Sequence, residues 1–146
     1  MQIKPEYQAV DEYAEIASAL VAKYPEIFPA IDVSQIRCVA VTNKSRGEKK
    51  KLWTITAVGM PVRMDCPFGW YVVIFMDDWV EMGLLHRQYL VASSLCAMPA
   101  DGEEGKIFHP DLKDYAVMLR TFGVDYLDKP ADEMIDLLKG DIKWIT

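Results

Sequence analysis

The side chains best suited to catalysis lie in the second half of this 146-residue chain. There are only two histidines, His86 and His109, and the adjacent serines Ser93 and Ser94 lie between them. A serine nucleophile needs a base such as histidine to take its proton. No GxSxG turn surrounds either serine, and serines buried in a helix are the commoner explanation. The pattern therefore does not favour a serine hydrolase.

A metal site is the second kind of chemistry that these residue types allow. Several carboxylates lie near His109 in the sequence: Asp101, Glu103, Glu104 and Asp111. A catalytic zinc takes three protein ligands, so one imidazole cannot form such a site by itself. A lone histidine is more often a capping or surface group. His109 is therefore only a weak candidate ligand.

Hydrophobic periodicity predicts the elements that must position these residues. Apolar residues at three-and-four spacing over 10–24 predict a helix that stops at Pro25. Three runs rich in β-branched and aromatic residues, 36–42, 52–60 and 69–76, predict strands of one small sheet. The third run is apolar at nearly every position, which is typical of a strand covered on both faces. Residues 43–51 are basic and contain a glycine, which indicates a hairpin loop more than a phosphate-binding patch.

The remaining predicted elements are helices. Asp77 or Asp78 could cap a short helical turn, and a helix over 84–98, ended by Pro99, carries apolar residues around a wide arc that predicts burial on more than one side. Further helices are predicted over 111–122, followed by Gly123, and over 131–140, which ends at Gly140. Without a repeat or linker, the chain 1–146 is expected to be one domain.

Composition narrows the class of protein. The net charge of −6 disfavours nucleic acid as the main partner. No apolar run reaches the roughly 20 residues that span a bilayer, and the N-terminus lacks the apolar core of a signal peptide, so a cytoplasmic location without membrane contact is expected. Cys38, Cys66 and Cys96 are odd in number and widely spaced, and we interpret them as small buried apolar residues.

The order of these pieces resembles the phage metallopeptidases, a zincin-like family of phages, prophages and bacteria. The resemblance covers most of the chain and depends on four segments, "YPEIFPAIDVSQIRCVAV", "GWYVVIFMDDWVEM", "HRQYLVASSLCAM" and "DLKDYAVMLRTFG", in this order and spacing. It implies an α+β, zincin-like fold. A small sheet of three or more strands would be packed by the N-terminal helix, a central former active-site helix and C-terminal helices.

The resemblance also shows what this chain lacks. In an HExxH helix, histidines at i and i+4 hold one Zn²⁺ and the glutamate acts as base for the bound water. Aligned through Leu90 and Leu95, those positions are occupied by Ser93, Ser94 and Ala97. None of the three can replace the family residue. The site is degenerate, and zinc, the cofactor of the family, is not expected here.

Two hypotheses of different class follow. The first is a non-catalytic metallopeptidase-like domain, a pseudoenzyme that acts by binding a protein or peptide partner. The second is a metal-dependent hydrolase of the same family with non-standard ligands, namely His109 with the nearby carboxylates of Asp101, Glu103, Glu104 or Asp111.

Overall fold

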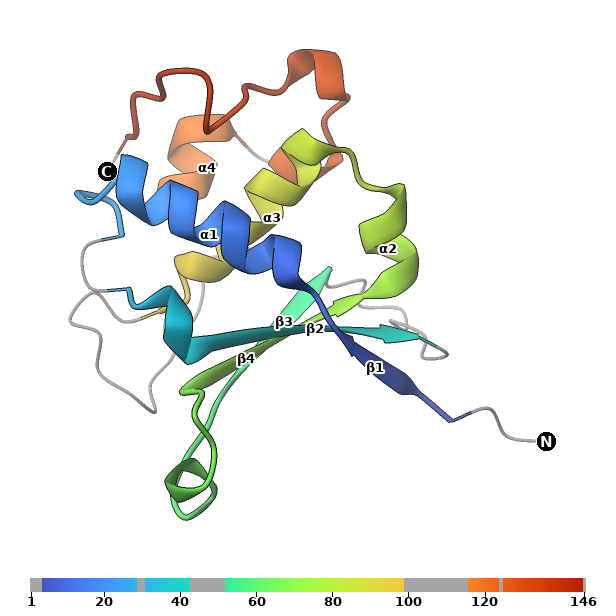
Figure 1. Cartoon of the computed structure of the whole chain (residues 1–146). Helices are drawn as coiled ribbons and strands as arrows, with labels where there is room; N and C mark the ends of the chain where they lie inside the picture. Colours follow the sequence, from blue (N-terminus) through green and yellow to red (C-terminus); the bar gives the residue numbers. More distant parts are fainter. Residues whose placement is uncertain (1–3, 29–30, 43–51, 99–115, 124, 146) are drawn as a thin grey trace.

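The computed structural model describes residues 4–28, 31–42, 52–98, 116–123 and 125–145 (Figure 1). Its strands are β1 (Glu6–Ala9), β2 (Ile36–Thr42), β3 (Trp53–Ala57) and β4 (Trp70–Phe75). Its α-helices are α1 (Asp11–Lys23), α2 (Met76–Glu81), α3 (Leu84–Leu95) and α4 (Ala116–Phe122). The described residues contain no helix that is both long and apolar enough to cross a membrane.

The strands form one mixed sheet in the order β1-β2-β4-β3. The two central strands are parallel, with Ile36 opposite Trp70 and Val41 opposite Phe75. The edge strands β1 and β3 run antiparallel to β2 and β4. The three predicted strands are confirmed, although β3 ends before the Gly59-Met60-Pro61 turn. The first strand, β1, was not predicted from the sequence.

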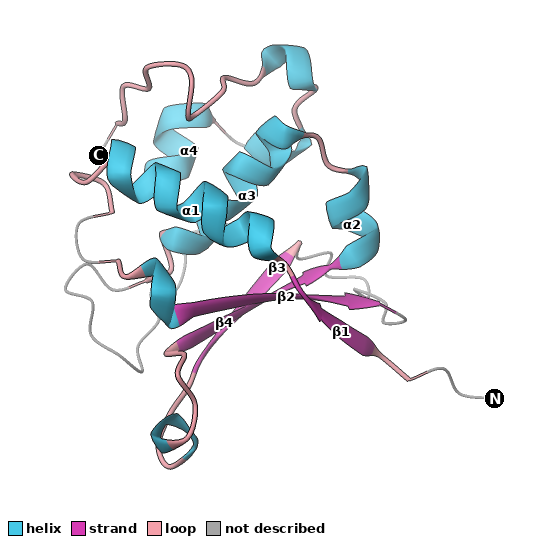
Figure 2. Ribbon diagram, in the orientation of Figure 1, coloured by secondary structure: helices cyan, strands magenta, loops and turns pink. Residues whose placement is uncertain are grey.

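The four helices lie on one side of the sheet (Figures 1 and 2). Alternate residues of β4, namely Trp70, Val72 and Ile74, are buried against them, while the intervening residues are only partly buried. The expectation that this strand is covered on both faces is therefore wrong for the described residues. The other face of β4 carries Tyr71, Val73 and Phe75, which are less deeply buried.

Two local predictions are also wrong. The helix predicted over 131–140 is instead a short 3₁₀ turn, Ala131–Glu133, followed by irregular chain. In that chain the carboxylate of Asp136 accepts the backbone N–H groups of Leu138 and Lys139, which replaces helical hydrogen bonding. Asp77 and Asp78 do not cap α2, because the cap position is Phe75 and both aspartates lie in the first turn. There their negative charges interact favourably with the positive end of the helix dipole.

The other predicted helices agree with the structure. The N-terminal helix is α1, the central helix is α3, and α4 forms the end of the helix predicted over 111–122. Residues 111–115 of that helix and the loop 43–51 lie outside the described residues. The expectation that 43–51 is a hairpin loop is wrong, because the strands on either side of it, β2 and β3, are separated in the sheet by β4. The buried core runs between the helices and the covered face of the sheet, where Tyr13, Leu20, Val72, Leu90 and Met118 are almost inaccessible.

Candidate functional site

Helix α3 carries Ser93 and Ser94, two of the three positions that the family resemblance would align with HExxH, and the third, Ala97, lies in the turn just after the helix. The helix packs against α1 and β3, and eight successive residues, from Gln88 to Leu95, are buried. This run confirms the prediction, made from the wide apolar arc, that the helix is buried on more than one side. Ser93, Ser94 and Ala97 are each 0% exposed. The structure therefore places all three candidate positions in the protein interior.

The hydroxyl of Ser94 is held between α3 and α1. Its Oγ donates to the carbonyl oxygen of Val91 at 2.7 Å, and lies 2.6 Å from the hydroxyl of Tyr13. Because the single hydroxyl hydrogen of Ser94 goes to Val91, Tyr13 is the donor in the second bond. Burial raises the pKa of Tyr13 far above its ordinary value, so the phenol stays protonated and can donate.

Ser93 makes a similar contact with a different part of the chain. Its Oγ hydrogen-bonds the hydroxyl of Tyr126 and the carbonyl oxygen of Tyr89. Tyr126 is 1% exposed and lies in a 3₁₀ turn directly after Asp125, whose backbone is left-handed with φ 62°. Both serines are thus paired with buried tyrosines from distant parts of the chain.

This arrangement does not suit hydrolysis. A catalytic zinc needs three side-chain ligands and an open position for water, whereas these hydroxyls are buried and already bonded. His86 lies seven residues before Ser93, and its Nε2 is 2.7 Å from the carbonyl oxygen of Lys129. Within the described part of the chain, neither serine has an imidazole among its hydrogen-bond partners. The role that these contacts support is structural: they join α3 by hydrogen bonds to α1 and to the 3₁₀ turn of Tyr126.

The remaining metal-ligand candidates, His109, Asp101, Glu103, Glu104 and Asp111, lie outside the described residues. Among the residues that the structure does describe, no group of three or more histidine, cysteine, aspartate or glutamate side chains is arranged to hold a metal ion.

The cysteines differ in their surroundings. Cys38 is buried beneath the helices, as predicted, and burial raises the pKa of its thiol to about 12. Cys66 and Cys96 are only partly buried, so the interpretation of all three as buried is wrong. The Phe68 backbone and the Tyr71 hydroxyl, 3.6 Å from the Cys66 sulfur, hydrogen-bond this thiol and lower its pKa.

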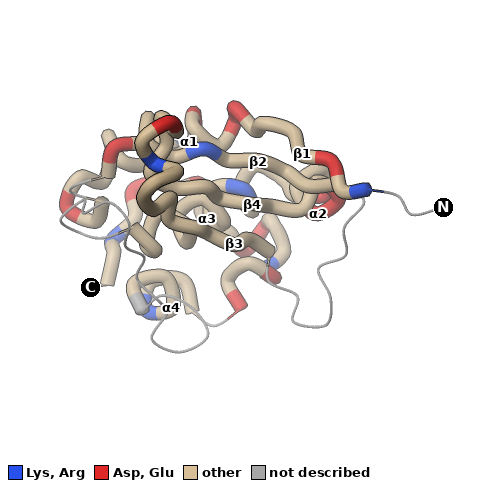
Figure 3. Tube along the Cα trace, turned by 90° about the horizontal axis from the view of Figure 1, so that it is seen from below, with Lys and Arg blue, Asp and Glu red and all other residues tan. Residues whose placement is uncertain are grey.

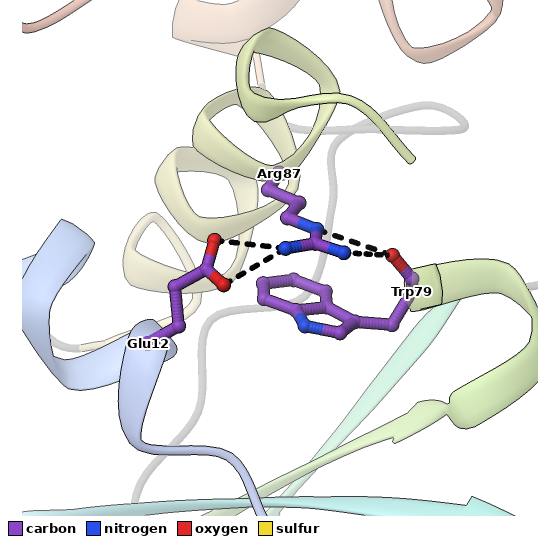
Figure 4. A network of polar contacts seen from close by, with 3 residues as sticks. All are labelled: Glu12, Trp79 and Arg87. Carbon is purple, nitrogen blue, oxygen red and sulfur yellow. Dashed lines mark hydrogen bonds and ion pairs between the residues drawn. The ribbon is translucent and has the colours of Figure 1, made fainter. Parts of the chain in front are cut away.

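Sequence patterns did not reveal a charged clamp beside α3 (Figure 4). Nη1 of Arg87 lies 3.0 and 2.8 Å from the two carboxylate oxygens of Glu12. Nε and Nη2 donate to the carbonyl oxygen of Trp79, and the guanidinium carbon is 4.7 Å from the centre of the Trp79 ring. The clamp joins α1, α2 and α3. Glu12 lies 75 residues before Arg87 in the sequence, so no local spacing could have identified the clamp.

Comparison with protein-family models, with curated proteins and with solved structures gave no match to this chain. Its function must therefore be argued from its own residues.

Proposed function

We propose that this α+β protein is a non-catalytic, zincin-like domain of phage, prophage or bacterial origin that acts by binding a protein or peptide. The observation that carries the proposal is the state of the three HExxH-aligned positions. Ser93 and Ser94 are buried and hydrogen-bonded to tyrosines, and Ala97 has no group that could bind a metal. A helix in this state serves to hold the fold together.

The order of elements supports the zincin-like part of the proposal. A helix, a small mixed sheet and a buried central helix follow one another in the order that the family resemblance implies. The charge distribution supports a partner other than nucleic acid. In the view of Figure 3, acidic and basic residues are scattered over the described part of the chain without a continuous basic band, which phosphate backbones require.

The competing hypothesis is a metal-dependent hydrolase that uses His109 with nearby carboxylates. We would measure the zinc content of the full, untagged chain after purification in zinc-containing buffer, together with two variants, His109→Ala and the control His86→Ala. The proposal predicts far less than one zinc per chain in all three. About one zinc per chain in the natural protein and in His86→Ala, lost in His109→Ala, would establish the competing hypothesis.

A further inference from the structure

The C-terminal segment, residues 134–140, is bound to the helices mainly through their side chains. The N–H of Ile135 donates to the hydroxyl of Tyr89 at 3.0 Å, and the N–H of Leu137 donates to Oε1 of Gln88 at 2.8 Å. The hydroxyl of Tyr24 donates to the carbonyl oxygen of Leu137 at 2.6 Å. Side chains of α3 and of the end of α1 thus satisfy the main chain of a segment that has no regular structure of its own.

Two further features make this surface selective for particular side chains of the segment that it binds. Nε2 of Gln88 donates to the carboxylate of Asp136 at 3.0 Å, so one amide recognises both a main-chain N–H and an acidic side chain. Met134 and Leu137, at 7% and 0% exposure, are buried on either side of that aspartate, while Ile135 is 51% exposed. The bound pattern is apolar, any residue, aspartate, apolar.

Gln88 is the central residue of this surface. It is 1% exposed, and both ends of its amide are engaged by the C-terminal segment. A buried polar group destabilises the folded state unless its hydrogen-bond partners are in place. If the segment left, Gln88, Tyr24 and Tyr89 would present hydrogen-bonding groups arranged for a peptide that forms the same turn, in which the N–H of Gly140 donates to the carbonyl oxygen of Asp136.

From these contacts we propose that the surface formed by Tyr24, Gln88 and Tyr89 is a peptide-binding site, and that residues 134–140 are its resting, intramolecular occupant. The partner is a peptide segment of another protein with the same apolar-x-Asp-apolar pattern, whose aspartate begins a turn as Asp136 does. This inference rests on the proposed function, because it names the class of partner that the binding domain would take.

An intramolecular occupant lowers the apparent affinity for a competing peptide by the fraction of molecules in which the site is open. A variant in which residues 134–140 are held less tightly, but in which Tyr24, Gln88 and Tyr89 are unchanged, must therefore bind the free peptide more tightly. Asp136→Ala is such a variant. It removes from the chain the contact with Gln88 and the carboxylate's bonds to the Leu138 and Lys139 amides, whereas a peptide of natural sequence still provides all three. Of these three, only the contact with Gln88 joins the segment to the helices.

The test uses the full chain and a fluorescein-labelled peptide of residues 131–142, ADEMIDLLKGDI, followed by fluorescence anisotropy. We expect Asp136→Ala to bind this peptide about tenfold more tightly than the natural chain, the size expected from one hydrogen bond to a charged group. The matched control is Asp132→Ala, which makes the same change in charge at an exposed position of the same segment. It should bind like the natural chain.

Two further measurements identify the site. Gln88→Met combined with Asp136→Ala should reverse the gain, and so should a peptide in which the aspartate corresponding to Asp136 is alanine. Circular dichroism of each variant confirms that it is folded. A folded Asp136→Ala variant with no tighter binding, or a gain that survives Gln88→Met, would overturn the proposal. In that case the segment is only part of the fold.

A concentration-dependent dimer formed without peptide would also contradict the proposal, because the site would then take the C-terminal segment of a second copy. Failure here can be distinguished from failure of the proposed function. A chain that holds zinc in the metal measurement is an enzyme candidate whatever its peptide binding, and a metal-free chain that does not bind this peptide still acts through another surface.

Discussion

The buried pair of Tyr13 and Ser94 allows the role of α3 to be tested by its energetics. Ser94→Ala leaves the hydroxyl of Tyr13, 81 residues away in the sequence and in the core, without its acceptor. An unsatisfied buried donor costs about 1–3 kcal/mol, and the better helix propensity of alanine returns roughly 0.5 kcal/mol. We therefore expect Ser94→Ala to lower the free energy of unfolding by about 1–2 kcal/mol.

Tyr13→Phe should cost less, about 0.5–1.5 kcal/mol, because Ser94 keeps its bond to Val91. In the double variant both partners are absent, so its loss should be smaller than the sum of the two single losses by about 1 kcal/mol. Urea unfolding of the four proteins, with equal m values, measures this coupling. Tyr7→Phe, at a tyrosine that is 60% exposed, is the control and should change stability by less than about 0.5 kcal/mol.

A coupling energy near zero would refute this reasoning. It would mean that the two hydroxyls do not form a mutual bond in the interior, and that Ser94 is free to face a ligand.

Three other predictions concern separate parts of the chain. Arg87→Met should lower the free energy of unfolding by about 1–3 kcal/mol, because it removes the contacts to Glu12 and the Trp79 carbonyl together; thermal unfolding measures the loss. Cys66 should react with iodoacetamide faster than Cys38, since the pKa of its thiol is lowered whereas that of Cys38 is raised to about 12; peptide mass spectrometry of the labelled chain decides this. Partial burial acts to raise the pKa of Asp136, but the bonds from Gln88 and the Lys139 and Leu138 amides outweigh it and lower the pKa below 3.8. The stabilising effect of this carboxylate is therefore present above pH 3.8 and lost as the pH falls through the folded-state pKa, so the stability difference between the natural chain and Asp136→Asn should shrink in acid.

Periodicity predicted the main elements because each one has a single apolar face or a buried run. The apolar stripe of α1 and the wide apolar arc of α3 correspond to the residues that are buried in the fold. The four residues of β1 are too few and too polar for such a signal. The helix predicted over 131–140 is wrong because Met134 and Leu137, three residues apart, have helical spacing without forming a helix. The side chains of Asp136 and Gln88 accept backbone N–H groups of this segment in place of helical carbonyl oxygens.

The candidate site shows where sequence reasoning stops. Alignment through Leu90 and Leu95 identifies the residues at the motif positions, but it cannot show that Tyr13 and Tyr126 fill the space beside them. Those partners are remote in the sequence and have no spacing rule. Placing histidine at Ser93 and Ala97 and glutamate at Ser94 would enlarge three side chains in a closed core and bury a charge, so we expect this triple variant to be strongly destabilised before any metal binds.

The central claim, that the folded domain neither holds nor needs zinc, is tested most directly by thermal unfolding of the untagged chain in EDTA and in excess Zn²⁺. A native-state ligand present at 100 times its dissociation constant adds about 2.7 kcal/mol of stability, which for a chain of this size raises Tm by roughly 5–10 °C. We predict the same Tm in both conditions. A rise of that size in zinc, reversed by EDTA and absent in His109→Ala, would contradict the claim.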